Sequence, residues 1–509
     1  MSFQLGVDRL DCQMLVQLAS EANPNVTVNS DVREKLQEYR NIVESAIKTE
    51  KKIYGINTGF GYLSDVYIKK EQLEELQVNL IRSHACGVGN SVNPEIVRAL
   101  LILRAHTFCL LHSAVSLQCI DTILAFLKHD ILPLVPVKGS VGASGDLAPL
   151  SHLALGLLGE GEVFFQGAVV PASEALEACG IDPYVPKAKE GLSLINGTQF
   201  MTAIAAFAIS EAKELAVIAD VATSLSLDAL RGTKRAYDPR IHQVRPQIGQ
   251  RTSADNINSL FANEDEIMNS HVECGKVQDP YSFRCAAQVH GASRDTISFV
   301  EKTVEIELNS VTDNPLVFAD GDVISGGNFH GQPIAMAMDF LAIAVAELGS
   351  ISERRIEKLT NPSLSSLPAF ITKDSGLNSG FMIPHVVAAS LVSENKVLCH
   401  PACVDSIPTS ADKEDHVSMG PIAARKARDV IDNVYSILAI ELLSACQGLD
   451  LLAPLRPSEQ LAVIYDKIRE ISPFMDKDRS LAGEFRQVVN WIKNGEIRSL
   501  LSKNGYKFI

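Results

Sequence analysis

The stretch KGSVGASGDLAPL, Lys138 to Leu150, joins a glycine-rich turn to the start of a helix. It contains three small residues in a row, Ala143, Ser144 and Gly145, whose backbone can react with itself. If the Gly145 nitrogen attacks the Ala143 carbonyl and Ser144 loses its hydroxyl, a five-membered ring forms that carries an exposed methylidene group. Such a step needs a tight backbone, and glycine lets its nitrogen approach without a Cβ in the way. The stretch therefore predicts an electrophile made from the chain alone.

Asp146 is predicted to be the N-cap of a helix that opens with Leu147, so that the positive end of the helix dipole would face the ring. Two other interpretations fit this short string. One is an ordinary small-residue turn before a helix. The other is a serine-hydrolase elbow, which is disfavoured because the G-x-S-x-G pattern needs a second glycine where Asp146 stands.

Composition favours a large helical protein. The 509 residues exceed the size at which one compact core stops growing, and 46% of them are hydrophobic while only 6% are aromatic. This balance suits long packed helices better than sheets. Lys and Arg total 46 against 61 for Asp and Glu, so the net charge of -15 argues against nucleic-acid binding through a basic face.

Ten cysteines without regular spacing, and no stretch like a secretion signal in MSFQLGVDRLDCQML, indicate reduced thiols in a cytoplasm. No apolar stretch is expected to be long enough and free enough of charge to cross a bilayer. The tightest group of metal-ligand types is Cys399, His400 and Cys403. No second ligand pair follows at finger spacing, so no metal site is expected.

Apolar patterns predict long helices. Asn93 and Pro94 read as an N-cap and first helical position, and residues 96–127 are apolar on nearly every face. Further long helices are expected at about residues 200–230, 333–359, 381–398 and 421–452. Short hairpins are expected at residues 163–170 and 317–325, which turn on Gln166-Gly167 and Asp320-Gly321. The polar stretch 245–273 is expected to be a surface loop.

Six further motifs accompany the ring loop. They are YGINTGFG from Tyr54, SHACGVG from Ser83, INGTQ from Ile195, QDPYSFRC from Gln278, SGGNFH from Ser325 and EDHVSM from Glu414. With the ring loop they span most of the chain, in an order that resembles the aromatic amino acid lyases and, within them, the histidine ammonia-lyase branch. The resemblance implies an enzyme that eliminates ammonia from L-histidine to give trans-urocanate, the first step of histidine degradation.

The resemblance implies a mainly α fold, a long-helix bundle of the fumarase/aspartase-like type with small β-hairpins. The best boundary lies near residues 191–197, which gives an N-terminal helical domain at 1–195 with the electrophile loop and a long-helix domain at 196–509. Long apolar faces need something to bury them. The family implies a homotetramer whose central bundle buries them and whose active sites are shared between subunits.

The resemblance also assigns the catalytic residues. Ala143, Ser144 and Gly145 would form 4-methylidene-imidazol-5-one autocatalytically, with 2,3-didehydroalanine at Ser144 and no external cofactor. Substrate nitrogen, or alternatively the substrate's aromatic ring, would add to the methylidene. Tyr54 would take the β-proton, assisted by Tyr281 from a neighbouring subunit. A phenol titrates near 10 when unperturbed, so Tyr54 would need help to act as a base.

Substrate contacts follow from the same motifs. Arg284 is suited to bidentate pairing with the substrate carboxylate. Asn196 and Gln278 would complete the carboxylate and amine contacts, and Asn196 would also support ring formation. Phe329 would pack beside the ring.

Substrate choice is expected to depend on His84 and Glu414. Relatives that act on tyrosine or phenylalanine tend to carry His-Leu or Phe-Leu where this chain has Ser83 and His84. A buried imidazole needs its polar edges satisfied, and His84 with Glu414 would supply an acceptor and a donor. Glu414 would also exchange a proton with the substrate ring, and Met382 would form an apolar wall.

The chain departs from the family at residues 110–114. Relatives usually show an Arg-Gly-x-Ser-Gly run where this chain has Leu110, Leu111, His112, Ser113 and Ala114, and a more helical, apolar segment is expected here. Two alternative functions stay open. One is a tyrosine or phenylalanine ammonia-lyase or an aminomutase of the same family, and the other is a non-catalytic helical scaffold.

Overall fold

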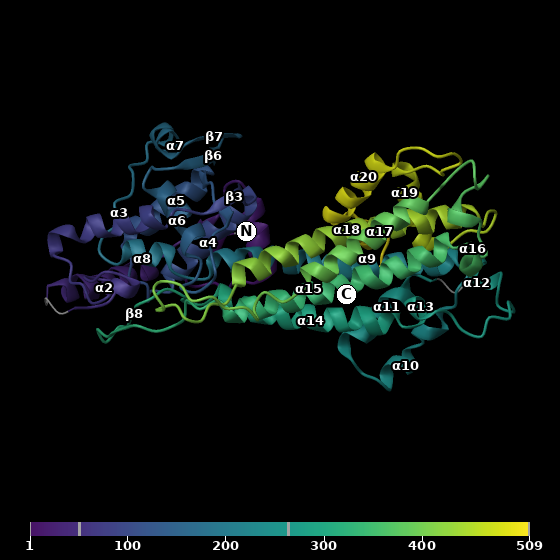
Figure 1. Cartoon of the computed structure of the whole chain (residues 1–509), viewed down its shortest axis with the longest axis horizontal. Helices are drawn as coiled ribbons and strands as arrows, with labels where there is room; N and C mark the ends of the chain where they lie inside the picture. Colours follow the sequence, from purple (N-terminus) through teal and green to yellow (C-terminus); the bar gives the residue numbers. More distant parts are fainter. Residues whose placement is uncertain (1, 49–51, 262–264, 507–509) are drawn as a thin grey trace. The chain divides into compact units, whose positions relative to one another are not determined.

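Helices dominate the structure, and the prediction of a mainly α fold with small strands is confirmed (Figure 1). The computed structural model describes residues 2–48, 52–261 and 265–506. The chain forms two compact units. The first consists of Met1–Ser210, Val300–Asp339 and Pro401–Arg425, and the second of Glu211–Phe299, Phe340–His400 and Lys426–Ile509. The predicted boundary between residues 195 and 196 falls within the first unit and stays a prediction.

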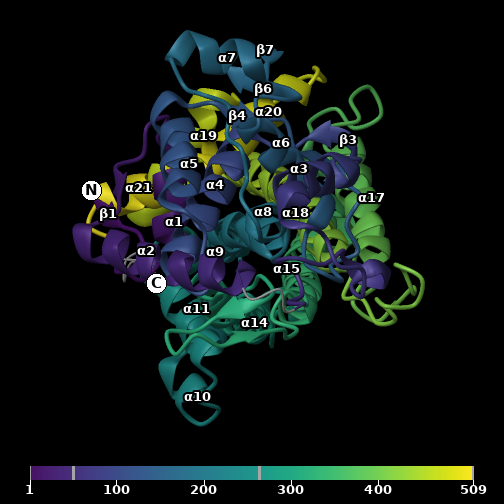
Figure 2. The same ribbon diagram turned by 90° about the vertical axis from the view of Figure 1, so that its left-hand side faces the viewer.

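The first unit holds eight of the described helices in full and all the described strands. Its helices are α1 (Cys12–Ser20), α2 (Ser30–Ile47), α3 (Leu73–His84), α4 (Pro94–Cys109), α5 (Leu117–His129), α6 (Leu147–Leu157), α7 (Ala172–Cys179) and α8 (Glu190–Ile195). Its strands are β1 (Phe3–Gln4), β2 (Val26–Thr27), β3 (Val88–Ser91), β4 (Leu132–Pro133), β5 (Pro136–Lys138), β6 (Glu162–Phe165), β7 (Ala168–Pro171), β8 (Leu316–Val317) and β9 (Val323–Ile324). Helices α3, α6 and α8 pack against one another, as both views show (Figures 1 and 2).

Four long helices contribute residues to each unit. They are α9 (Gln199–Ala229), α14 (Ala286–Leu308), α15 (Gln332–Thr360) and α18 (Gly420–Asp450). The remaining helices of the second unit are α10 (Pro239–Gln243), α11 (Ile248–Ser259), α12 (Glu266–Asn269), α13 (Tyr281–Arg284), α16 (Pro362–Ser365), α17 (Met382–Leu398), α19 (Glu459–Ile471), α20 (Ala482–Lys493) and α21 (Glu496–Lys503). Helices α9, α15, α17 and α18 confirm the predicted long helices to within a few residues.

Both predicted hairpins are present. Strands β6 and β7 pair antiparallel through a turn in which Gln166 and Gly167 have φ of 49° and 84°. Strands β8 and β9 also pair antiparallel, and Gly321 in their turn has φ of 94°. Positive φ favours glycine, so the Gly-containing turns identified both hairpins correctly.

The apolar run at residues 96–127 is two helices, α4 and α5, separated by a bend. The expectation of a more helical segment at Leu110–Ala114 is wrong, because Leu111 and Ala114 have φ of 82° and 52°. Partners distant in sequence hold the bend: Val317 N donates to His112 O at 2.9 Å and Ser113 Oγ to Asp313 Oδ1 at 2.8 Å. Local periodicity cannot detect such partners.

The expected surface loop at residues 245–273 is also wrong in part, since it contains α11 and α12. Helix α14 has no counterpart among the predictions. Both α11 and α14 bury polar side chains: the buried carboxylate of Asp220 accepts hydrogen bonds from Asn256 at 3.0 Å and His290 at 2.7 Å. A hydrophobic period therefore misses these helices.

Among the described residues, only α15 is long and apolar enough to cross a membrane by length and composition, so the expectation of no such stretch is wrong for this helix. Within the protein, 67% of its most apolar window is buried. A core helix passes the same test, and this burial is typical of one.

Candidate active site

A cavity of about 770 Å³ in the first unit brings together seven of the predicted site residues. They are Tyr54, His84, Ala143, Ser144, Asn196, Phe329 and Glu414. They come from the turn at residues 54–56, the last residue of α3, the turn before α6, the residue after α8 and two loops, at residues 325–330 and 410–416. The packing of α3, α6 and α8 therefore places segments far apart in the sequence around one space.

The turn before α6 is as tight as the ring hypothesis requires. Gly142 and Gly145 have φ of 65° and 73°, which L side chains rarely adopt. A Cβ on Gly145 would lie 2.2 Å from the carbonyl oxygen of Gly197, so glycine is the residue that fits. Asp146 N donates to the same oxygen at 2.7 Å. The turn is thus pressed against the chain between α8 and α9.

Polar contacts hold Ser144 from two sides. Asn196 Nδ2 donates to the Ser144 carbonyl oxygen at 2.7 Å, and Ser144 Oγ donates to Glu414 Oε1 at 2.5 Å. The second carboxylate oxygen of Glu414 accepts from Thr409 Oγ1 at 2.6 Å. Backbone bonds between Thr409 and Glu414 close the loop around residues 410–412, which all have positive φ. Glu414 is therefore fixed with one carboxylate oxygen toward the turn at residues 142–145, which is called the ring turn below.

Asp146 stands at the N-cap position of α6 as predicted, but its side chain does not cap that helix. Its Oδ2 instead accepts a hydrogen bond from Met201 N, in α9, at 3.0 Å. The side chain is fully buried, and burial raises the pKa of its carboxyl to about 7. Asp146 thus ties the start of α6 to the start of α9.

Tyr54 is half-buried at the cavity, with its ring edge-on to Phe60. Burial raises the pKa of its phenol above 10, the nearby Glu414 charge raises it further, and a backbone hydrogen bond with Gly61 lowers it. The neutral phenol is therefore the dominant form near neutral pH. Within this chain the Gly61 contact is the one identified effect that favours a phenolate.

His84 presents a defined tautomer to the cavity. Its Nδ1 lies 2.8 Å from the carbonyl oxygen of Leu80, an acceptor, so the hydrogen is assigned to Nδ1. Its Nε2 is then an acceptor that can receive an N–H group of a ligand. Glu414 lines the same cavity.

Sequence reasoning missed two further histidines at this cavity, His330 and His416. Their rings stack with centroids 5.7 Å apart and planes 6° apart. Both lie inside quoted motifs, SGGNFH and EDHVSM, and this was the available signal. Among the described residues, no group of three or more His, Cys, Asp or Glu side chains is arranged to hold a metal ion.

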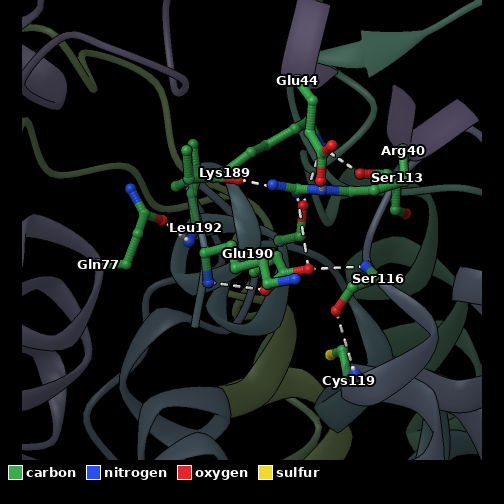
Figure 3. A network of polar contacts seen from close by, with 12 residues as sticks. Arg40, Glu44, Gln77, Ser113, Ser116, Cys119, Lys189, Glu190 and Leu192 are labelled. Atoms are coloured by element: carbon green, nitrogen blue, oxygen red, sulfur yellow. Dashed lines mark hydrogen bonds and ion pairs between the residues drawn. The ribbon is translucent and has the colours of Figure 1, made fainter. Parts of the chain in front are cut away.

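A buried polar network supports the start of α8, the helix that ends just before Asn196 (Figure 3). Lys189, only 1% exposed, donates from Nζ to Ser113 O at 2.8 Å and to Asp313 Oδ2 at 3.0 Å. The buried carboxylate of Glu190 accepts from Ser116 N at 2.6 Å and lies 3.6 Å from the guanidinium of Arg40. These paired charges fix α8 against the bend between α4 and α5.

Gly145 follows Ser144 in the first unit, and the other four predicted residues belong to the second unit. Gln278, Tyr281 and Arg284 line a separate cavity of about 470 Å³ there, and the Arg284 guanidinium lies 4.7 Å from the centre of the Tyr281 ring. Tyr281 is 70% exposed, and Met382 is the first residue of α17. None of these four lines the cavity around Ser144.

Comparison with known proteins extends over nearly the whole chain. Residues 10–470 match the aromatic amino acid lyase family. A histidine ammonia-lyase of Alkaliphilus oremlandii is 50% identical over 479 residues, 94% of each chain. The crystal structure of histidine ammonia-lyase from Trypanosoma cruzi is 45% identical, with a TM-score of 0.91 over 99% of this chain and 95% of that one. Tyrosine aminomutase from Streptomyces globisporus is 35% identical, with a TM-score of 0.93 over 99% of each chain. The chain belongs to the aromatic amino acid lyase family.

Proposed function

We propose that this protein is an ammonia-lyase that converts L-histidine to trans-urocanate and ammonia, the first step of histidine degradation. The observation that carries the proposal is that His84 and Glu414 line the same cavity as Ser144. The His84 Nε2 and the Glu414 carboxylate are both acceptors that suit N–H groups, of which a neutral imidazole ring has one and a protonated ring two, whereas a phenyl ring would leave them unpaired. The histidine ammonia-lyases among the relatives support the same substrate.

The electrophile is proposed to arise from Ala143, Ser144 and Gly145. The Gly145 nitrogen bonds to the Ala143 carbonyl carbon, whose oxygen leaves as water with the two amide hydrogens. Ser144 then loses its hydroxyl and α-hydrogen as a second water. Support comes from the left-handed backbone of Gly145 and from its close approach to Gly197. The resulting methylidene-imidazolone would supply an electron-poor carbon for the substrate, with no external cofactor.

Tyr54 is proposed as the base that removes the β-proton, because it lines the cavity with Ser144. Its raised pKa means that only a small fraction is phenolate at neutral pH. Asn196 is proposed to hold the Ser144 carbonyl and to contact the substrate, and Phe329 to pack beside the ring.

Gln278, Tyr281, Arg284 and Met382 are proposed to act on a neighbouring subunit's substrate in a homotetramer. The first three gather in a cavity of their own, where Arg284 offers a planar charge for a carboxylate. Tyr281, which is 70% exposed, would assist the base, and Met382 would form the apolar wall. Gel filtration or light scattering that gives a monomer would overturn this arrangement.

A cytoplasmic location is proposed, with no nucleic-acid or membrane partner. Burial raises the pKa of the Cys109 and Cys446 thiols to about 12, which keeps them protonated and unreactive. Buried thiols of this kind suit a reducing compartment, and the net charge of -15 argues against a nucleic-acid partner.

A substrate panel tests the function. Purified full-length protein is incubated separately with L-histidine, L-tyrosine and L-phenylalanine, and the products are followed by absorbance and chromatography. Urocanate from histidine alone is expected. Coumarate or cinnamate would indicate a tyrosine or phenylalanine ammonia-lyase, a β-amino acid would indicate an aminomutase, and no product from any substrate would favour the scaffold; each of these results overturns the proposal.

A further inference from the structure

Arg104 is a buried charge that lies one contact away from the ring turn. It belongs to α4 and is 0% exposed. Its Nη1 donates to Asn196 O at 3.2 Å and to Gln199 Oε1 at 2.5 Å, and its Nη2 donates to Ser193 O. The guanidinium also lies 4.7 Å from the centre of the Phe108 ring. The side chain therefore connects the end of α8 to the start of α9.

The segment that Arg104 holds is the one pressed against the ring turn. Asn196 Nδ2 donates to Ser144 O at 2.7 Å, and Gly197 O accepts from Asp146 N at 2.7 Å. A Cβ on Gly197 would lie 2.8 Å from Arg104 Nη1. The guanidinium thus packs directly against the backbone of Asn196 and Gly197.

Both the charge and the fork shape of arginine matter at this position. Burial lowers the pKa of Arg104 to about 10, so the side chain is still cationic at neutral pH. A buried cation needs hydrogen-bond acceptors, and here it has two backbone carbonyls and one amide oxygen. Arginine can reach several acceptors in fixed geometry, which lysine cannot do from one ammonium.

We propose that Arg104 is a positioning residue for cyclisation, acting through Asn196 and Gly197 to hold Ala143, Ser144 and Gly145 in the reactive geometry. The inference rests on the proposed electrophile. It has a physical basis in the sensitivity of intramolecular reactions to placement, since a displacement of about 1 Å can slow a reaction by about 10²-fold. Without the guanidinium, the Asn196–Gly197 backbone has space to relax away from the turn.

Arg98 provides a matched control on the same helix. It is 6% exposed and donates from Nε to Asp130 Oδ1 at 2.9 Å and from Nη1 to Ala19 O. In the part of the chain that the structure describes, these hydrogen bonds reach neither residues 142–145 nor residues 193–199. Arg98→Met therefore removes a buried, hydrogen-bonded arginine from α4 but leaves the hydrogen bonds to residues 193–199 in place.

The test is a time course of intact mass on the full-length chain, sampled after a short induction, with a thermal melt of each variant. Wild type and Arg98→Met are expected to become lighter by two waters at similar rates. Arg104→Met is expected to acquire this deficit about 10²-fold more slowly, and Arg104→Lys at an intermediate rate. A full deficit in Arg104→Met at the wild-type rate would overturn the proposal.

Two further outcomes keep this proposal distinct from the proposed electrophile. If wild type shows no deficit, the electrophile itself is wrong. If Arg104→Met does not fold, Arg104→Lys decides: slower cyclisation in folded protein supports positioning, and the wild-type rate contradicts it.

Discussion

The side-chain amide of Asn196 lies 2.7 Å from the carbonyl oxygen of Ser144, although the two residues are 52 positions apart in the sequence. This contact connects the end of α8 to the turn that begins α6. In the proposed reaction, the Cβ of Ser144 becomes the methylidene carbon, so the contact places a fixed hydrogen-bond donor on the carbonyl of the residue on which catalysis depends.

Ser144→Ala is expected to abolish both the two-water deficit and turnover of histidine. Alanine has no hydroxyl to lose, so no methylidene can form. Intact mass and urocanate absorbance measure the two effects. Ser151→Ala is the control, because Ser151 is a buried serine of α6 whose hydroxyl bonds to Leu147 O. Normal turnover in Ser144→Ala would contradict the assignment.

Tyr54→Phe is expected to keep the deficit but to lower kcat by about 10²–10⁴-fold, the usual contribution of a general base. Because the pKa of Tyr54 is raised above 10, the phenolate fraction in wild type grows with pH, so kcat is expected to rise from neutral into alkaline solution. This rise is expected to disappear in Tyr54→Phe. Tyr39→Phe, on α2, serves as the control. An unchanged kcat in Tyr54→Phe would remove this residue from the mechanism.

Glu414→Gln is expected to lower kcat/KM for histidine by roughly 10–10²-fold, because a hydrogen bond to a charged group contributes about 1.5–3 kcal/mol. Steady-state kinetics measure the effect. Asp412→Asn is the matched control: it removes one nearby negative charge, and asparagine tolerates the positive φ of 64° at this position. An equal loss of activity in both variants would mean that only local charge matters.

Asp146→Asn is expected to change how stability depends on pH. The folded carboxyl has a pKa of about 7 against an ordinary 3.8, so the folded state retains a proton that the unfolded state releases. This contribution is present below about pH 4 and is lost as pH rises through about 7, a fall of about 4 kcal/mol in the free energy of unfolding. Urea midpoints measured between about pH 5 and pH 8 should fall less steeply in Asp146→Asn.

Asp182→Asn, at an exposed position, is the control for this stability experiment. It should reproduce the wild-type dependence on pH. Equal slopes in Asp146→Asn and wild type would show that Asp146 is ionised in the folded protein at neutral pH.

Much of the architecture follows from local pattern. Helices such as α9 and α18 carry apolar residues around most of their surface, and the turns of both hairpins contain glycine with positive φ. Seven of the residues that were assigned from the motifs also line one cavity. These features depend on residues close together in the sequence, or on a pattern shared with relatives.

The features that sequence reasoning missed depend on distant partners. Helix α14 buries polar residues such as His290, whose partner Asp220 lies in α9. Arg104 and Lys189 are buried and hydrogen-bonded, and nothing in their local sequence signals this burial. The loop that orients Glu414 depends on left-handed residues such as Ser410, which no local propensity favours.

The close approach of Gly145 to Gly197 also implies an order of events during biosynthesis. A growing chain that ends before residue 197 lacks the surface against which the turn is compressed. We therefore expect that residues 143–145 of the nascent polypeptide do not cyclise until α8 and the start of α9 have packed against the turn. Cyclisation would then follow the folding of this region, so that a chain in which the region has not folded carries no electrophile that could react with the thiols of other molecules.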